Sequence, residues 1–77
     1  MDNKNLSLEG LIFEAIELSV VNNIMCITLN RPEKNNAINP VMANEIIYSL
    51  AFAAQERDIR VVVIKANGDV FCAGGDL

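Results

Sequence analysis

The order of apolar and polar positions predicts a β-hairpin near the start of the chain. Residues 11–20 alternate moderately between apolar and polar side chains, which is typical of a strand. Residues 24–29 are rich in β-branched side chains and predict the returning strand. Asn22 and Asn23 lie between them, and asparagine tolerates positive φ better than other non-glycine residues. The pair therefore predicts a two-residue hairpin turn.

A helix is predicted to begin at Pro40, with Asn39 as its N-cap. Asparagine is a favoured capping residue, and proline suits the first helical position because its missing N–H needs no partner there. Apolar residues then recur at steps of three and four. The helix is expected to end near Glu56 and Arg57. The stripe that we expect in the core consists of Met42, Ile46 and Leu50.

Residues 61–64 form an unbroken β-branched run, Val-Val-Val-Ile, which differs from the alternating pattern of a half-exposed strand. It predicts a parallel strand covered on both faces. Strand 24–29, the helix and this strand then form one βαβ crossover. The chain ends before the helix expected after Asp76, so within these residues one side of this strand is expected to stay uncovered. Residues 1–10 are predicted to be a flexible lead-in, and residues 11–77 one structural unit.

Composition narrows the function classes. The chain has 77 residues, 52% of them hydrophobic, which allows one small domain. A net charge of −4 argues against nucleic acid or an anionic membrane as partner. The absence of histidine excludes Ser-His and Cys-His catalysis and Cys/His zinc sites in this segment, and we expect no metal. Cys26 and Cys72 lack CxxC spacing and are predicted to be reduced, buried thiols of a cytoplasmic protein.

Two loops are the candidate ligand sites, because ligands of α/β folds collect beyond the carboxyl ends of the strands. Residues 30–39 and 66–76 both follow strands of the same crossover, so they should be neighbours in space. In the second loop, Gly74 and Gly75 allow consecutive amides to converge on an anion, such as a reacting oxyanion. The alternative is a plain tight turn in which Asp76 caps a following helix.

The first loop leaves a similar choice open. Arg31 and Lys34 could meet phosphates, or they could be two solvated charges. Asn35 and Asn36 could satisfy nearby backbone groups without any ligand. A dinucleotide-binding unit is disfavoured, because no G-x-G-x-x-G motif follows the first strand.

Two segments together resemble a known family. The first is Ile27–Ile38, ITLNRPEKNNAI; the second is Val61–Ile64 followed by Gly68 and then by Phe71–Leu77, FCAGGDL. In this order and at this spacing they resemble the two N-terminal blocks of the crotonase superfamily, the enoyl-CoA hydratase/isomerase family. The resemblance covers nearly the whole chain from about Leu11. It implies an α/β fold, the N-terminal ββαβ portion of a crotonase-like (ClpP/crotonase) spiral fold that is incomplete here.

The resemblance also implies a site. The family acts on acyl-CoA thioesters, with coenzyme A as part of the substrate and no separate cofactor, and assembles as trimers or hexamers. The Gly75 N–H corresponds to the first of two oxyanion-hole amides. The positions expected to bind coenzyme A or the acyl group are Lys34, Asn36, Ala37, Ala73, Gly74 and Asp76.

The resemblance predicts that the chain is the N-terminal part of an acyl-CoA hydratase or isomerase. In the family, the second oxyanion amide and the acid/base carboxylates come later in the sequence, beyond Leu77. The 77 residues alone are therefore expected to be inactive. Two alternatives remain: an acyl-CoA hydrolase or another crotonase-type lyase, and a non-catalytic truncated fragment.

Overall fold

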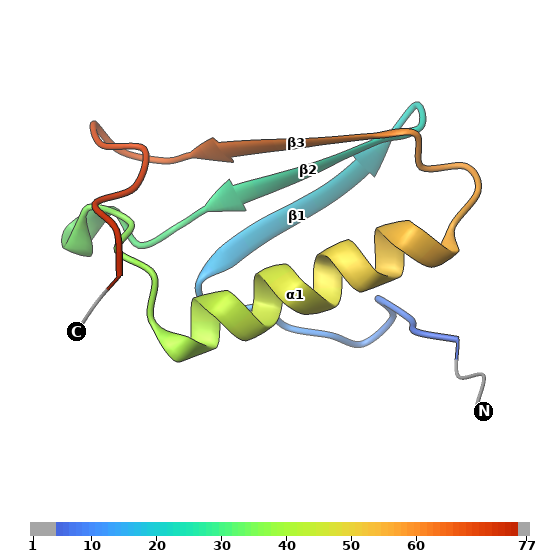
Figure 1. Cartoon of the computed structure of the whole chain (residues 1–77), viewed down its shortest axis with the longest axis horizontal. Coiled ribbons are helices and arrows are strands. Elements are labelled where there is room, and N and C mark those ends of the chain that lie inside the picture. Colours follow the sequence, from blue (N-terminus) through green and yellow to red (C-terminus); the bar gives the residue numbers. More distant parts are fainter. Residues whose placement is uncertain (1–4, 76–77) are drawn as a thin grey trace.

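The computed structural model describes residues 5–75 and consists of a three-stranded sheet with one long helix across one face (Figure 1). The strand order is β1-β2-β3. Asp76, one of the predicted site residues, lies outside the described residues. In chain order the elements are β1 (Ile16–Val21), β2 (Ile24–Leu29), the 3-10 helix η1 (Pro32–Lys34), α1 (Pro40–Gln55) and β3 (Val61–Ala66).

The predicted hairpin is present. β1 and β2 pair antiparallel, with Val21 opposite Ile24 at the turn. Asn22 and Asn23 both have positive φ, 51° and 71°, which confirms the two-residue turn. β1 is shorter than predicted, because its first residues are bound elsewhere: the backbone amides of Glu14 and Ala15 donate to the Glu45 carboxylate on α1.

The crossover from β2 to β3 is also as predicted. The two strands run parallel, from the pair Ile24–Val61 to the pair Leu29–Ala66, and α1 connects them. Asn39 caps the helix, since its side-chain oxygen accepts from the Met42 amide at 2.9 Å. The predicted start of the helix is therefore confirmed, and it ends at Gln55, one residue before the expected boundary region.

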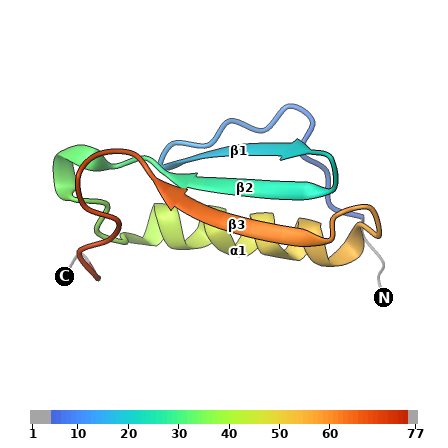
Figure 2. The same cartoon turned by 90° about the horizontal axis from the view of Figure 1, so that it is seen from above.

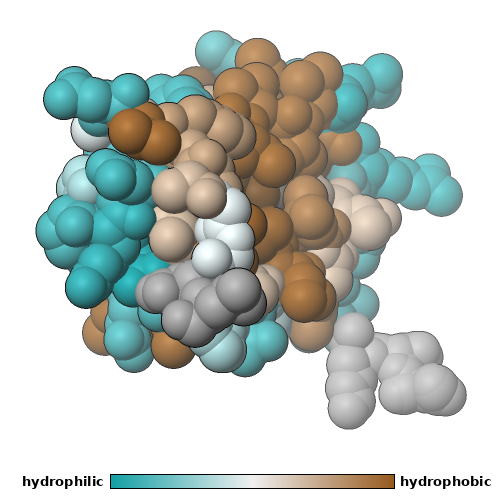
Figure 3. All heavy atoms as spheres, turned by 60° about the vertical axis from the view of Figure 1, so that its left-hand side comes forward, coloured by the Kyte–Doolittle hydropathy of each residue, from teal (hydrophilic) through white to brown (hydrophobic). Residues whose placement is uncertain are grey.

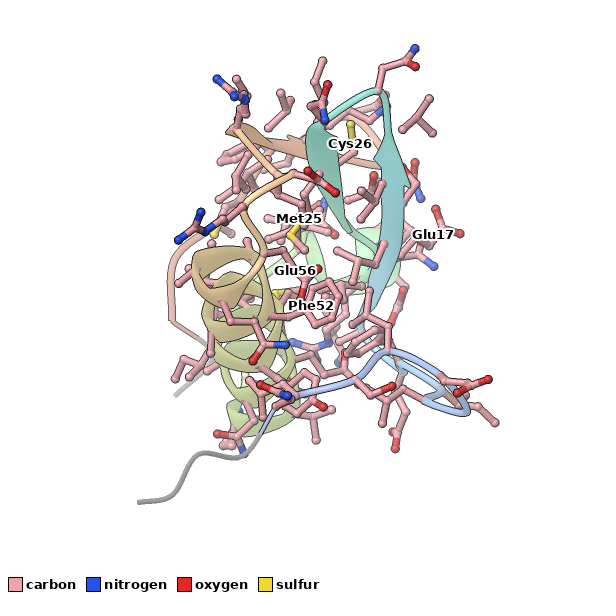
Figure 4. All side chains as sticks on the ribbon, turned by 90° about the vertical axis from the view of Figure 1, so that its right-hand side faces the viewer. Glu17, Met25, Cys26, Phe52 and Glu56 are labelled. Atoms are coloured by element: carbon pink, nitrogen blue, oxygen red, sulfur yellow. The ribbon has the colours of Figure 1, made fainter. Side chains whose placement is uncertain are left out.

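The core lies between α1 and one face of the sheet. Met25 and Ile27 of β2 are fully buried there, together with Met42 of α1. Figure 4 shows Met25 and Phe52 between sheet and helix, with Cys26 on the opposite face of β2. Of the predicted core stripe, Met42 is buried and Ile46 packs partly buried against the core. Leu50 is 41% exposed, because it lies on the side of α1 that turns away from the sheet.

β3 differs from the prediction of a strand covered on both faces. Val61 and Val63 on one face and Ile64 on the other are all exposed. The physical reason is position: β3 is an edge strand, and among the described residues α1 lies against β1 and β2 more than against β3. Figure 3 shows apolar side chains gathered in a continuous band on this side of the molecule. The exposed apolar residues of α1 are Val41, Ile47 and Leu50.

Residues 6 and 7 of the N-terminal segment bond to α1, and the segment then runs along the outer side of β1, away from α1 (Figure 2). The side chain of Gln55 accepts from the Leu6 amide and donates to the Leu6 carbonyl, at 2.9 and 2.7 Å. The Tyr48 hydroxyl makes the equivalent pair of bonds with Ser7. These paired bonds tie residues 6 and 7 to α1, and the flexible lead-in over residues 1–10 stays a prediction. In the described part of the chain, no helix is long and apolar enough to cross a membrane.

Candidate functional site

The loops that follow β2 and β3 lie against each other, as the topology predicted. The Ala73 amide donates to the Asn35 carbonyl at 3.0 Å, and the Ile38 amide donates to the Gly74 carbonyl at 2.8 Å. A parallel bridge pairs Ile38 with Gly75. Residues 35–38 and 73–75 thus run side by side, and Figure 1 shows both segments at the end of the sheet where β2 and β3 finish.

Asn36 lies at the centre of this junction and is fully buried. Its side-chain oxygen accepts from the Arg31 amide at 2.7 Å. Its side-chain nitrogen donates to the carbonyls of Asn67 and Val70, at 2.7 and 2.9 Å. The side chain has no exposed surface to offer a ligand. The Asn36 side chain lies between the two loops and satisfies backbone groups there, and the contact with coenzyme A that the resemblance implies for this position stays a prediction.

The beginning of the second loop is fixed by Asn67 and Gly68. The Asn67 amide donates to the Leu29 carbonyl, and its side chain donates to the Asn30 side chain at 3.0 Å. Gly68 has φ of +90°, and a Cβ there would lie 2.9 Å from the Pro32 Cβ. Only glycine fits this close approach without a shift. Sequence reasoning identified a turn at this point but missed the cross-loop contacts, for which no local signal exists.

Gly75 carries the amide of greatest chemical interest. Gly74 has φ of +102°, and its N–H donates to the Cys72 sulfur at 3.4 Å. The Gly75 N–H, by contrast, donates to no acceptor among residues 5–75, and Gly75 is exposed. Nothing lies within 4 Å of the position that a Gly75 Cβ would take. Gly75 therefore presents a backbone donor in an uncrowded place, which suits an incoming oxyanion.

The two basic residues of the first loop differ in role. Arg31 is half-buried and donates from Nη1 to the Ala37 carbonyl, so it closes the loop on itself rather than lying free in solvent. Lys34 ends the short helix η1 and is exposed, with no ion pair or hydrogen bond to its ammonium group among the described residues. Of the two, Lys34 is the one available to a phosphate.

The backbone groups of the other predicted positions are partly occupied. The Ala73 amide and the Ala37 carbonyl both bond within the loops. The side chain of Cys72 is a free, half-buried thiol, as is that of Cys26, so both are less buried than predicted. The described residues enclose no pocket. The candidate site is thus an open surface where the loops meet, built mostly from backbone groups.

These features define a class of protein. An α/β unit joins the carboxyl-end loops of two parallel strands and presents a glycine amide at their junction, which is how such folds bind negatively charged or polarised ligands through the backbone. Comparison with known families identifies it further. The family model for enoyl-CoA hydratase/isomerase matches residues 19–77, and the chain belongs to this family. The crotonase-type fold predicted from the motifs is confirmed by structural neighbours.

Relatives show how much of the family's length is covered. A trans-2-decenoyl-[acyl-carrier-protein] isomerase from Streptococcus mutans is 38% identical over 65 residues, which are 84% of this chain and 25% of that protein. A probable enoyl-CoA hydratase structure from Mycobacterium smegmatis has a TM-score of 0.78 at 41% identity, covering 82% of this chain and 26% of that one. An enoyl-CoA hydratase/isomerase structure from Mycobacterium paratuberculosis has a TM-score of 0.83 at 32% identity, covering 86% of this chain and 26% of that one. The chain spans about a quarter of the length of the curated relatives it matches.

Proposed function

We propose that the protein carrying this chain binds an acyl-CoA thioester across the two joined loops, and that the Gly75 N–H donates to the thioester carbonyl oxygen. The observation that carries the proposal is the exposed Gly75 amide, which has no acceptor among residues 5–75. The whole protein would hydrate or shift a C=C bond next to the thioester, the reaction class of the family to which the chain belongs.

The chemistry of that reaction needs such a donor. When a nucleophile adds to an enoyl thioester, or a proton leaves its α-carbon, negative charge gathers on the carbonyl oxygen. A donor fixed near 3 Å from that oxygen stabilises the charged state more than the ground state, by about 3 kcal/mol for a typical oxyanion-hole group. The amide of Gly75 is held by the bridge between Ile38 and Gly75 and needs no rearrangement to serve.

The remaining predicted positions would bind the coenzyme A portion. Lys34 would meet a phosphate, since its ammonium group is exposed and has no partner among the described residues. The backbone of Ala73 and the turn at Gly74 would line the path of the pantetheine arm. Ala37 would contribute its backbone from the opposite loop. The family resemblance supports these roles and a binding role for Asp76.

The resemblance assigns the second oxyanion amide and the acid/base carboxylates to segments that follow this one in the family. We therefore propose that the 77 residues alone bind without appreciable turnover. The same resemblance supports a trimer or hexamer for the whole protein, and the two free cysteines support a cytoplasmic location. The apolar band in Figure 3 supports association of this region with other structure.

One observation favours a second candidate, an isomerase acting on a thioester of acyl carrier protein. The Streptococcus mutans relative bears that name at 38% identity. Acyl carrier protein presents the same phosphopantetheine thioester as coenzyme A but lacks the adenine nucleotide. The Gly75 donor would serve both substrates, and Lys34 would matter most for the nucleotide phosphates of coenzyme A.

The test is a titration of the isotopically labelled chain with butyryl-CoA, butyryl-acyl carrier protein and free coenzyme A, followed by amide NMR. We expect the Gly75 resonance to shift with both thioesters and not with free coenzyme A. Lys34→Ala should weaken binding of butyryl-CoA by about fivefold, as for one exposed ion pair near 1 kcal/mol, and that of the carrier protein less. A Gly75 resonance unmoved by either thioester would contradict the proposal.

A further inference from the structure

Asn36 joins three points of the backbone that are far apart in the sequence. Its side chain bonds to Arg31 at the start of the first loop, and to Asn67 and Val70 in the second, across 31 and 34 residues. On either side of it along the chain, backbone bonds from Asn35 and Ile38 hold the segment that ends at Gly75. The side chain therefore spans the gap between the two loops next to the proposed donor.

The partners fix the orientation of the amide group. The Arg31 backbone N–H requires an acceptor, while the Asn67 and Val70 carbonyls each require a donor. A primary amide supplies both donors and the acceptor from one end of a short side chain. A carboxylate would supply the acceptor and no donors, and a hydroxyl would supply one donor only. Asparagine is thus the shortest side chain that satisfies all three groups at once.

The backbone conformation adds a further constraint. Asn36 has φ of +56°, and Asn35 has φ of +53°, so two consecutive residues lie in the left-handed region. Asparagine adopts this region more readily than other residues with side chains, and glycine adopts it freely. The left-handed pair turns the Asn36 side chain inward, where it is fully buried, while Asn35 stays exposed.

We propose that Asn36 is a positioning residue: through Asn67 and Val70 it sets where the loop bearing the Gly75 amide lies relative to the loop bearing Lys34. This inference rests on the proposed function for its catalytic meaning. The action proposed for the Asn36 side chain is indirect, through the loops that it joins. A substrate that spans both loops is bound well only if the spacing between them is held.

The chain offers a matched control. Asn35→Asp changes the same residue type in the same left-handed conformation at an exposed position whose side chain makes no hydrogen bond to the described residues. Asn36→Asp keeps the acceptor for Arg31 and removes both donors. Asn36→Gly removes all three bonds, keeps the positive φ without strain and buries no charge, so it serves if the aspartate variant does not fold.

The experiment measures amide hydrogen exchange by NMR across the whole chain, with butyryl-CoA binding as a second readout. For an Asn36 variant we expect exchange of the Ala73 and Ile38 amides, which bond across the two loops, to speed up by about tenfold or more, with amides of β2 unchanged. Affinity for butyryl-CoA should fall by a similar factor, whereas Asn35→Asp should match the wild type in amide exchange.

Two results would overturn the inference. If the Ala73 and Ile38 amides exchange in the Asn36 variants as they do in the wild type, the loop does not depend on this side chain. If both variants unfold, or lose protection in β2 as much as in the loop, Asn36 supports the fold in general and does not position the loop. If instead the wild type fails to bind butyryl-CoA, the proposed function fails, while the exchange comparison still decides the positioning role.

Discussion

β2 and β3 are neighbours of equal length and similar composition with opposite surroundings. Each has six residues, each is rich in β-branched side chains, and they pair in parallel from end to end. Four of the six residues of β2 are buried, whereas β3 has none that is buried. β2 has a strand on either side of it and α1 across one face, but β3 lies at the edge of the sheet.

The difference shows that an apolar sequence pattern alone does not tell whether a strand is buried within these residues. The pattern Val-Val-Val-Ile is typical of strands covered on both faces. Within these residues β1 and α1 cover β2 and leave β3 largely open. β3 is the edge strand of the described sheet, and the chain matches about a quarter of the length of its curated relatives.

The largest expected effect on stability comes from alanine substitutions at Ile27 in β2 and Ile64 in β3, which lie opposite each other in the parallel pairing. Both side chains lie on the helix side of the sheet, but Ile27 is 0% exposed and Ile64 is 43% exposed. Ile27→Ala should lower the free energy of unfolding by about 3 kcal/mol, because it leaves a cavity in the core. Ile64→Ala should cost roughly 1 kcal/mol, since much of its surface already meets water.

Urea denaturation of both variants and the wild type measures this comparison. Because a chain of this size is marginally stable, Ile27→Val offers a milder version of the core change, worth about 1 kcal/mol. If the two alanine variants lost the same free energy of unfolding, the two strands would be equally buried, and β3 would be covered in solution.

A second prediction concerns the loops at the ends of the two strands. Gly68→Ala and Gly74→Ala both place a side chain at positive φ, +90° and +102°, but only at Gly68 would the new Cβ meet Pro32, at 2.9 Å. Both variants should lose about 1 kcal/mol of stability through backbone strain. Gly68→Ala should lose roughly 1 kcal/mol more through the clash.

Comparing the thermal unfolding of the two glycine variants separates the cost of backbone strain, which both share, from the cost of the clash with Pro32, which only Gly68→Ala has. A larger loss for Gly74→Ala would mean that the second loop packs more tightly near its end than at its start. The loops would then be joined mainly through residues 73–75 rather than through the contact of Gly68 with Pro32.

The smallest expected effect is that of Val63→Lys in β3. Val63 is 39% exposed on the face of the sheet away from α1, so a lysine can extend into water there. The free energy of unfolding should change by less than about 0.5 kcal/mol. Self-association should decrease, since a charge on an edge strand opposes pairing with other chains. Sedimentation at increasing concentration measures this, and a stability loss as large as that of Ile27→Ala would contradict it.

What the sequence could predict depended on local signals. The bounds of β2, the turn at Asn22 and Asn23, and the capping of α1 by Asn39 each rest on residues within four positions of one another. The closeness of the two loops followed from topology alone. The loops named by the motif do lie against each other, and the site that the resemblance implies on them, Gly75 included, stays a prediction.

What the sequence could not predict involves partners distant along the chain. The start of β1 is determined by Glu45, thirty residues later, whose carboxylate binds the amides of Glu14 and Ala15. The burial of Asn36 depends on carbonyls more than thirty residues away. The exposure of β3 depends on which elements are absent from its faces. None of these has a signature in neighbouring residues.

The span of the Asn36 hydrogen bonds has a consequence for the order of folding. A hairpin such as β1–β2 closes a two-residue turn and forms within microseconds, whereas contacts across 31 and 34 residues require the whole crossover to close first. The proposed donor loop is therefore among the last parts of the chain to be ordered. A nascent chain would hold its hairpin well before it could recognise a thioester.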